Sequence, residues 1–268
     1  GESNHEWVGS SRCVSCLARV PGILVDTGYG YPAMTEGSDY VCGEIYEMDD
    51  DVLLRIDGLE GYYGPGDSRN LYERIETTAI TDRGEVTVWT YVSGRFGVDS
   101  SIPYGDWKLH RLIRSSHVHY FAYGSCMDVE RIEQAGWLNQ FRKVVGRGRV
   151  GGCNLQFTRR SRDGGRADLV ETGGLTEGKV YHIPVEALEG YLYNREGVFS
   201  GIYRPVVVPV VLDDERTVDA VTFVVVDKQP ETPPKRWYME EILRGAKPVV
   251  SAPYYNALLD RFVSQFGY

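Results

Sequence analysis

Residues 119–125 read HYFAYGS, and they carry the strongest local signal of the fold. The aromatic residues of this stretch predict a β-strand, and Gly124 with Ser125 predicts a tight turn. Residues 127–132 (MDVERI) then predict the start of a helix. A strand–turn–helix junction leaves backbone N–H groups free to hold an anion such as a carboxylate. A plain strand-to-helix turn would give the same pattern, so the stretch gains its meaning from what surrounds it.

A repeat relates the two halves of the chain. In the first half a strand over residues 42–48 precedes a helix over residues 50–56. In the second half a strand over residues 178–183 precedes a helix that begins at Pro184. Each half continues with a Glu-Gly pair and closes with apolar strands. The same order of elements in both halves predicts two copies of one structural unit.

A glutamate recurs at the same place in the two copies. Glu60 follows the strand glycine Gly43 by 17 residues, and Glu196 follows Gly178 by 18 residues. Each glutamate lies in a predicted turn between a helix and a strand, which distinguishes the two from the remaining acidic residues. Other glutamates lack such a setting and are expected to be surface charges, among them Glu76, Glu171 and Glu186.

The joint between the copies is predicted around residues 96–116, where residues 97–105 are rich in Gly, Ser, Asp and Pro. We expect an N-terminal domain over residues 1–98, a linker over residues 99–116 and a C-terminal domain over residues 117–268. Frequent short strands with Gly and Pro between them predict an α+β fold. Each unit is expected to be a small mixed β-barrel or curved sheet with flanking helices.

The composition excludes several classes of protein. The chain has 38 acidic and 29 basic residues and a net charge of −9, which argues against a nucleic-acid surface. No apolar run approaches the roughly 20 residues that span a bilayer, and the pattern of a secretion signal is not visible in the first residues of this sequence. Five scattered cysteines, an odd count, suit a reducing compartment. We therefore expect a cytoplasmic protein without nucleic-acid or membrane partners, of unknown oligomeric state.

Potential metal ligands are few. Cys13 and Cys16 form a lone CxxC without a second ligand pair. His117 and His119 lie in a predicted strand, at a spacing too short for a helical pair of ligands. We interpret these residues as ordinary strand or loop positions and expect neither a metal nor a cofactor.

Several motifs of the second half resemble one enzyme family. Residues 120–125 (YFAYGS) closely resemble the opening motif of γ-glutamylcyclotransferases, F-x-Y-G-S-N. Residues 195–203 (REGVFSGIY) resemble the catalytic-glutamate loop of this family, and residues 233–258 resemble its closing helical region. Together these motifs cover most of residues 117–262 in the right order. The chain resembles a tandem, two-domain member of the γ-glutamylcyclotransferase-like (AIG2-like) superfamily.

The first half resembles a shorter branch, which includes γ-glutamylamine cyclotransferases and plant avirulence-induced proteins. The likeness rests on residues 21–24, 41–46, 59–61 and 89–92. In that branch a strand ending Y-G-T-L-R precedes a G-E-x-N-H stretch, whereas this sequence begins with GESNH at residues 1–5. We therefore expect the first strand of this unit to be missing from the sequence, which would leave Glu60 without its partner loop.

The resemblance implies a reaction. A γ-glutamyl compound would release an amine or amino acid and form 5-oxoproline, because its own α-amine attacks its γ-carbonyl. Backbone N–H groups at Tyr123, Gly124 and Ser125 would hold the α-carboxylate or the developing oxyanion. Glu196 would take a proton from the ammonium and pass it to the leaving amine, with Glu60 as the second candidate.

Two further residues are expected to bind the substrate. Tyr203 would hydrogen-bond the glutamyl part, although its hydroxyl could equally serve packing. Cys126 stands where the family usually has Asn, which would alter substrate fit or weaken catalysis. The acceptor stays open between an amino acid, a polyamine, a lysine side chain and an antibiotic intermediate. Glutathione is disfavoured, because its dedicated branch opens with a different Y-G-S-L motif.

Two other functions remain open. The chain could keep the fold as a non-catalytic γ-glutamyl-like ligand-binding or scaffold protein. It could also use Cys126 as a nucleophile beside a helix N-terminus. An alternating strand would point His117 and His119 to the face opposite Tyr120, which disfavours a Cys–His pair.

Overall fold

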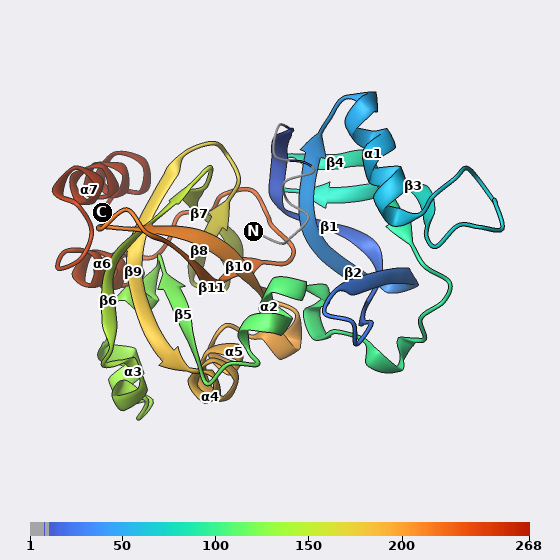
Figure 1. Cartoon of the computed structure of the whole chain (residues 1–268). Helices are drawn as coiled ribbons and strands as arrows, with labels where there is room; N and C mark the ends of the chain where they lie inside the picture. Colours follow the sequence, from blue (N-terminus) through green and yellow to red (C-terminus); the bar gives the residue numbers. More distant parts are fainter. Residues whose placement is uncertain (1–7, 9–10) are drawn as a thin grey trace. The chain divides into compact units, whose positions relative to one another are not determined.

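The structure is a computed structural model that describes residue 8 and residues 11–268. The GESNH stretch at residues 1–5 lies outside the described residues. The chain divides into two compact units between His110 and Arg111, inside the expected linker (Figure 1). Among the described residues, no helix is long and apolar enough to cross a membrane.

The first unit is built on one antiparallel sheet with strand order β2-β1-β3-β4. Its core contains Leu24, Met34, Val92 and Ile102, which pack together from different strands and from the segment after β4. A helix, α1, connects β2 to β3 (Figure 1). The five elements are β1 (Arg12–Asp26), β2 (Pro32–Glu47), α1 (Asp50–Glu60), β3 (Glu73–Thr81) and β4 (Gly84–Val92).

The helix α1 is longer than the sequence predicted. It continues to Glu60, so this residue belongs to the last helical turn and not to a loop. Gly61 ends the helix in the left-handed conformation, with φ 62° and ψ 38°, which glycine adopts without steric cost. The helix end therefore fixes the position of the Glu60 backbone.

The first part of the expected linker packs on the first unit. Ile102 belongs to the core of this unit and donates its backbone N–H to the Leu24 carbonyl at 2.8 Å. The Lys108 ammonium forms an ion pair with the Glu44 carboxylate. The segment consists of short helical pieces, η2 (Val98–Ser100), η3 (Pro103–Gly105) and α2 (Trp107–Leu112).

The second unit contains a closed barrel of five strands in the order β10-β11-β5-β9-β6 (Figure 1). Strand β5 pairs parallel with β11 and antiparallel with β9, so the barrel is mixed. This barrel and the curved sheet of the first unit confirm the predicted α+β fold. The barrel strands are β5 (His117–Ala122), β6 (Val144–Gly151), β9 (Leu175–Pro184), β10 (Tyr203–Leu212) and β11 (Thr217–Val225).

A two-stranded ribbon of β7 and β8 and several helices complete this unit. The predicted helix over residues 127–132 is instead a 3-10 turn, η4, followed by the short helix α3. Glu171, expected at the surface, is buried with 9% of its area exposed. The remaining elements are η4 (Ser125–Met127), α3 (Glu130–Gln134), η5 (Leu138–Phe141), β7 (Asn154–Ser161), β8 (Gly164–Val170), α4 (Val185–Ala187), η6 (Leu188–Leu192), α5 (Tyr193–Arg195), η7 (Val198–Ser200), α6 (Arg236–Ala246) and α7 (Ala252–Phe266).

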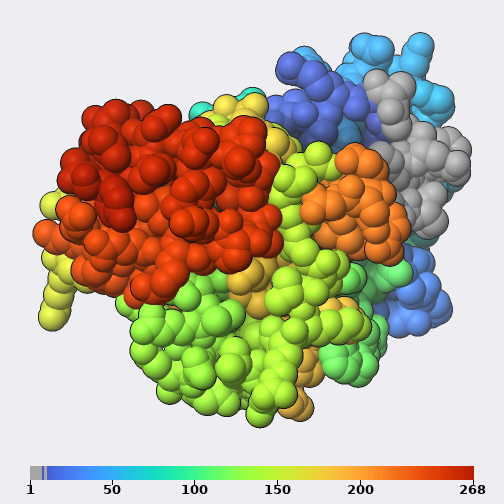
Figure 2. Space-filling model, turned by 90° about the vertical axis from the view of Figure 1, so that its left-hand side faces the viewer, coloured from blue at the N-terminus to red at the C-terminus, as the bar shows by residue number. Residues whose placement is uncertain are grey.

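The C-terminal helices α6 and α7 cover the second unit on one face, shown in red in Figure 2. Helix α6 is held to the segment after β5 by two charged contacts. The Arg244 guanidinium donates to Asp128 at 2.7 Å, and the Arg131 guanidinium donates to Glu241 at 2.8 Å. These contacts fix the C-terminal region beside the turn that follows β5.

Candidate functional site

The turn after β5 forms one wall of a pocket in the second unit. Strand β5 ends at Ala122, and the 3-10 turn η4 begins at Ser125. Gly124 lies between them, and a Cβ at this position would lie 2.9 Å from the Cβ of Ala167 on β8. A side chain here would therefore push the turn away from the ribbon. Glycine permits the close approach that shapes the pocket.

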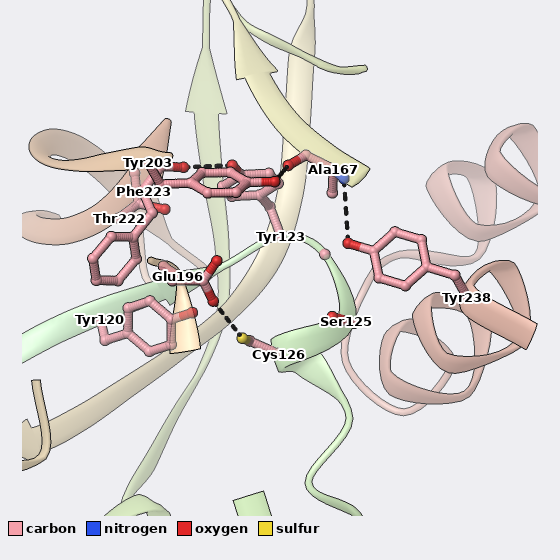
Figure 3. A pocket seen from close by; sticks show the side chains of 11 residues that line it. Tyr120, Tyr123, Ser125, Cys126, Ala167, Glu196, Tyr203, Thr222, Phe223 and Tyr238 are labelled. Atoms are coloured by element: carbon pink, nitrogen blue, oxygen red, sulfur yellow. Dashed lines mark hydrogen bonds between the residues drawn. The ribbon is translucent and has the colours of Figure 1, made fainter. Parts of the chain in front are cut away.

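Glu196 comes to the same pocket from a helical segment that covers one end of the barrel. The segment runs through α4, η6 and α5, and Glu196 occupies its C-cap. Gly197 then reverses the chain in the left-handed conformation, with φ 65°. The Glu196 side chain points into the pocket, with 18% of its area exposed (Figure 3).

A hydrogen-bonded cluster joins the turn to the glutamate. The Cys126 thiol donates to Glu196 Oε1 at 3.4 Å (Figure 3). Arg195 Nε donates to Cys126 Sγ at 3.1 Å and lies 3.5 Å from Glu196 Oε1. The same guanidinium donates to the Ser125 hydroxyl at 3.3 Å. Arg195 therefore holds two turn residues and the carboxylate in one arrangement.

The surroundings of this cluster alter its acid–base properties. Burial raises the pKa of the Glu196 carboxyl, and the opposing charge of Arg195 and the Cys126 hydrogen bond only partly offset this effect. Burial also raises the pKa of the Cys126 thiol to about 11. At neutral pH the thiol is therefore protonated and acts as a hydrogen-bond donor. A thiolate nucleophile at Cys126 is disfavoured by this environment.

Two tyrosines hold the ribbon strand β8 against the pocket. The Tyr203 hydroxyl donates to the Ala167 carbonyl at 2.7 Å, and the Ala167 N–H donates to the Tyr238 hydroxyl at 3.2 Å (Figure 3). Tyr203 was expected to bind the substrate. In the structure its hydroxyl proton is donated to the Ala167 carbonyl and is not free for a ligand. The oxygen of this hydroxyl keeps its capacity to accept a hydrogen bond.

The structure brings all the predicted site residues of the second half together. Tyr123, Gly124, Ser125, Cys126, Glu196 and Tyr203 line one pocket. Sequence reasoning did not single out the partner role of Arg195 or the lining residues Ala167, Thr222, Phe223 and Tyr238. Arg195 directly precedes the predicted glutamate, and Tyr238 lies in the C-terminal stretch that resembles the family. The strand residues Thr222 and Phe223 carried no comparable signal.

Glu60 lies in the first unit and does not line this pocket. Its setting matches that of Glu196, because each glutamate ends a helix before a left-handed glycine, Gly61 or Gly197. Burial raises the pKa of Glu60, and the charge of Glu60 contributes to the raised pKa of Tyr72. The repeat inferred from the sequence thus extends to the backbone around both glutamates.

The histidines of β5 lie on the other face of the strand from the pocket. Val118 and Tyr120 are buried, whereas His117 is exposed and His119 is half-buried. Tyr120 lines the pocket with Cys126, so the alternation directs both histidines away from the thiol. In the part of the chain that the structure describes, no group of three His, Cys, Asp or Glu side chains is placed to hold a metal ion.

Comparison with known proteins identifies the family. A family model described as "Gamma-glutamyl cyclotransferase, AIG2-like" matches residues 1–109, and a model described as "AIG2-like family" matches residues 176–258. The γ-L-glutamyl-butirosin B γ-glutamyl cyclotransferase of Niallia circulans is 42% identical over 120 residues, which are 44% of this chain and 75% of that protein.

The likeness to YkqA of Bacillus subtilis, provisionally named a γ-glutamylcyclotransferase, extends over both units. The two proteins are 36% identical over 264 residues, which are 96% of this chain and 91% of YkqA. The crystal structure of YkqA matches with a TM-score of 0.86, over 98% of this chain and 93% of that chain. On these grounds the chain belongs to the γ-glutamylcyclotransferase-like (AIG2-like) family, as a member with two tandem units.

Proposed function

We propose that the second unit releases 5-oxoproline and an amine or amino acid from a γ-glutamyl compound, with Glu196 as the proton carrier. The observation that carries the proposal is the hydrogen bond between the Cys126 thiol and Glu196 Oε1, at 3.4 Å. This hydrogen bond connects the turn, which is suited to binding the α-carboxylate of the substrate, to the Glu196 carboxyl, which is suited to transferring protons. Intramolecular ring closure requires a protein that orients the substrate and transfers protons, and the turn and the carboxyl would meet these two requirements.

The reaction needs a general base that becomes a general acid. The substrate ammonium must lose a proton before its amine can attack the γ-carbonyl, and the leaving amine must gain one. A carboxyl whose pKa is raised by burial transfers protons in both directions near neutral pH more readily than an exposed one. We therefore assign both transfers to Glu196.

The turn of Tyr123, Gly124 and Ser125 would hold the glutamyl end of the substrate. The first N–H groups of the helical turn η4 have no partner within that turn, so they are suited to a carboxylate or to the oxyanion formed during ring closure. The volume free for ligand atoms inside the pocket is about 40 Å³, roughly that of three water-sized groups. A cavity of this size leaves no room for the leaving amine, which would lie outside it.

The proposal does not specify the identity of the leaving amine. The Niallia circulans relative is named for a γ-glutamyl derivative of butirosin B, and its name supports a panel wider than dipeptides. We propose that γ-glutamyl amines and γ-glutamyl amino acids are both candidate substrates.

The test is release of 5-oxoproline from such a panel by the chain, by Glu196→Gln and by Glu186→Gln. The second variant makes the same change at an exposed position of the same helical segment. We expect Glu196→Gln to lower kcat by roughly 10²–10⁴-fold, the usual range for loss of general acid–base catalysis, and Glu186→Gln to leave it unchanged.

Equal melting temperatures of the three proteins would show that the variants fold. Undiminished turnover by Glu196→Gln would refute the assignment. If the unaltered chain yields no product but binds γ-glutamyl compounds, the ligand-binding function takes the place of the enzyme.

A further inference from the structure

A second hollow of the C-terminal unit lies at the beginning of β5, whereas the Glu196 pocket lies at the end of this strand. Its volume is about 480 Å³. Strands β5 and β9, the helical turn η5 and the segment between η5 and β6 supply its walls. The polar residues that line it are His117, Asn139, Gln140, Arg142, Lys143 and His182.

Two histidines, His117 and His182, line this hollow, and His119 contacts His182. His119 and His182 face each other across the β5–β9 ladder, with ring centroids 5.3 Å apart. His117 stacks on His182 at 5.0 Å, with 8° between the ring planes. Because the lone pairs of an imidazole lie in its ring plane, two parallel stacked rings cannot direct them at one metal ion. The cluster is therefore not a metal site in this arrangement.

The charge at the hollow is entirely positive. Arg142 and Lys143 are exposed, and neither forms an ion pair with a carboxylate of the described residues. No Asp or Glu is among the residues that line the hollow. In a chain with a net charge of −9, where many arginines pair with carboxylates, this local excess of cations is unusual. It creates a site of positive potential.

Two buried polar atoms at the hollow have no hydrogen-bond partner, Nδ1 of His182 and Oε1 of Gln140. Such atoms are uncommon in folded proteins, and they often mark a place where a ligand or an ordered water completes the network. Both belong to residues that line the hollow. Only Nδ1 of His182 can donate to an anion, because Oε1 of Gln140 is an acceptor and needs a donor such as an ordered water. The side chains that surround the hollow offer mostly N–H donors, which match an acceptor-only ligand.

We propose that this hollow binds a small oxyanion, such as a phosphate or sulfate group. The Lys143 ammonium, the Arg142 guanidinium and the Asn139 amide would donate hydrogen bonds to its oxygens. The imidazole rings of His117 and His182 would add charge when they are protonated. The site is separate from the Glu196 pocket, and its occupation does not depend on the proposed reaction.

The binding should strengthen as the pH falls. Burial and the charges of Lys143 and Arg216 lower the pKa of His119, and burial, Lys143 and the other two histidines lower the pKa of His182. The rings are therefore neutral in the free protein at neutral pH and become charged on acidification. A bound dianion favours the charged rings, so proton uptake and anion binding support each other. A hydrogen bond from His119 to the Asp219 backbone acts in the opposite direction and raises the pKa of this ring.

Sulfate is the suitable probe, because it keeps two negative charges over the whole range tested. Its affinity is measured by calorimetry at about pH 5.5 and about pH 8, at constant ionic strength in chloride. The proteins are the chain, Lys143→Gln, and Lys247→Gln as a matched exposed lysine at the end of α6. We expect saturable binding that is tighter at the lower pH and that Lys143→Gln weakens about tenfold or more.

Histidine proton signals, followed by NMR, give a second measurement. Saturating sulfate should raise the titration midpoint of His182 and shift the ring signals of His117, and it should leave the ring signals of His110, in the first unit, unchanged. Absence of saturable sulfate binding, or an equal loss of affinity in Lys143→Gln and Lys247→Gln, would overturn the proposal.

Discussion

At the scale of single residues, the pH dependence of turnover reports on Glu196. Ring closure needs Glu196 deprotonated at the start, so kcat/KM should fall as the pH decreases through the pKa of this carboxyl. Burial raises that pKa above the ordinary 4.5, and the acid limb of the profile should therefore lie above pH 4.5. A pH–rate profile with a γ-glutamyl substrate measures it.

Arg195 supplies an internal check of this assignment. Its charge lowers the pKa of Glu196, against the effect of burial. Arg195→Gln should therefore move the acid limb to higher pH, in addition to any loss of kcat. Arg160→Gln removes the same charge from an exposed position of β7 and should leave the limb in place. A limb that does not move in Arg195→Gln would mean that another group controls the profile.

Cys126 makes a different prediction, about thiol chemistry. Its pKa of about 11 keeps it protonated, and it is buried, whereas Cys13 and Cys16 are exposed. Iodoacetamide reacts with thiolates, so under native conditions it should label Cys13 and Cys16 first and leave turnover intact. Peptide mapping beside an activity assay tests this. Labelling of Cys126 before Cys13 and Cys16 would show a reactive thiolate at the pocket and would favour the cysteine-dependent enzyme.

Replacement of Cys126 by Asn should preserve activity. An amide can donate to Glu196 Oε1 and accept from Arg195 Nε, as the thiol does. Cys126→Ala offers neither interaction and should raise the pKa of Glu196 further. Turnover of both variants at one neutral pH tests whether the contact with residue 126 positions Glu196. If Cys126→Asn abolishes activity while Cys126→Ala does not, this contact does not position Glu196.

At the scale of elements, the turn that carries Glu196 contains two left-handed glycines with different surroundings. Gly197 and Gly201 both have φ 65°. A Cβ on Gly197 would lie 2.8 Å from the Ile202 side chain, whereas a Cβ on Gly201 would have no atom within 4 Å. Gly201→Ala should therefore cost about 1 kcal/mol of unfolding free energy, from backbone strain alone.

Gly197→Ala should cost more than Gly201→Ala, because the clash with Ile202 adds to the same strain. It should also lower kcat/KM, since the shifted backbone belongs to the residue next to Glu196. Chemical denaturation and steady-state kinetics of both variants measure these effects. Equal stability losses, or unchanged kinetics in Gly197→Ala, would show that the turn adapts without moving the carboxyl.

The elements near the site show what the sequence could predict. The aromatic residues and the turn at residues 119–125 predicted β5 and its end. The repeat predicted the two equivalent glutamates, Glu60 and Glu196. Both signals can be read from short segments of the sequence. The contact between Cys126 and Glu196 spans 70 residues and depends on closure of the barrel. No local pattern encodes the parallel pairing of β5 with β11 that closes the sheet. The ribbon of β7 and β8 was missed for the same reason, although it brings Ala167 to the pocket.

At the scale of the whole molecule, the Glu196 pocket is complete within one unit. Every residue that lines it lies between Tyr120 and Tyr238, and the second unit comprises Arg111–Tyr268. Residues 111–268 alone should therefore fold and should turn over γ-glutamyl substrates with kcat/KM close to that of the full chain. Circular dichroism checks the fold, and the 5-oxoproline assay checks activity. A folded but inactive fragment would mean that the first unit contributes to the site.

The two units also predict how activity is divided between Glu60 and Glu196. Both carboxyls end a helix before a left-handed glycine, and burial raises the pKa of both. Glu196 accepts a hydrogen bond from the turn that would hold the substrate, whereas burial is the one influence on the pKa of the Glu60 carboxyl among the described residues, without a hydrogen bond or ion pair to that carboxyl. Turnover by the full chain should therefore depend on Glu196 alone.

Three variants decide this division: Glu60→Gln, Glu196→Gln and the double variant. If one unit is active, Glu60→Gln turns over at the rate of the unaltered chain, and the double variant is no slower than Glu196→Gln. If both units are active, Glu196→Gln keeps a residual rate that the double variant loses. The substrate panel makes the comparison more informative. A residual rate confined to γ-glutamyl amines would assign a different substrate class to the first unit, whose motifs resemble the branch that includes γ-glutamylamine cyclotransferases.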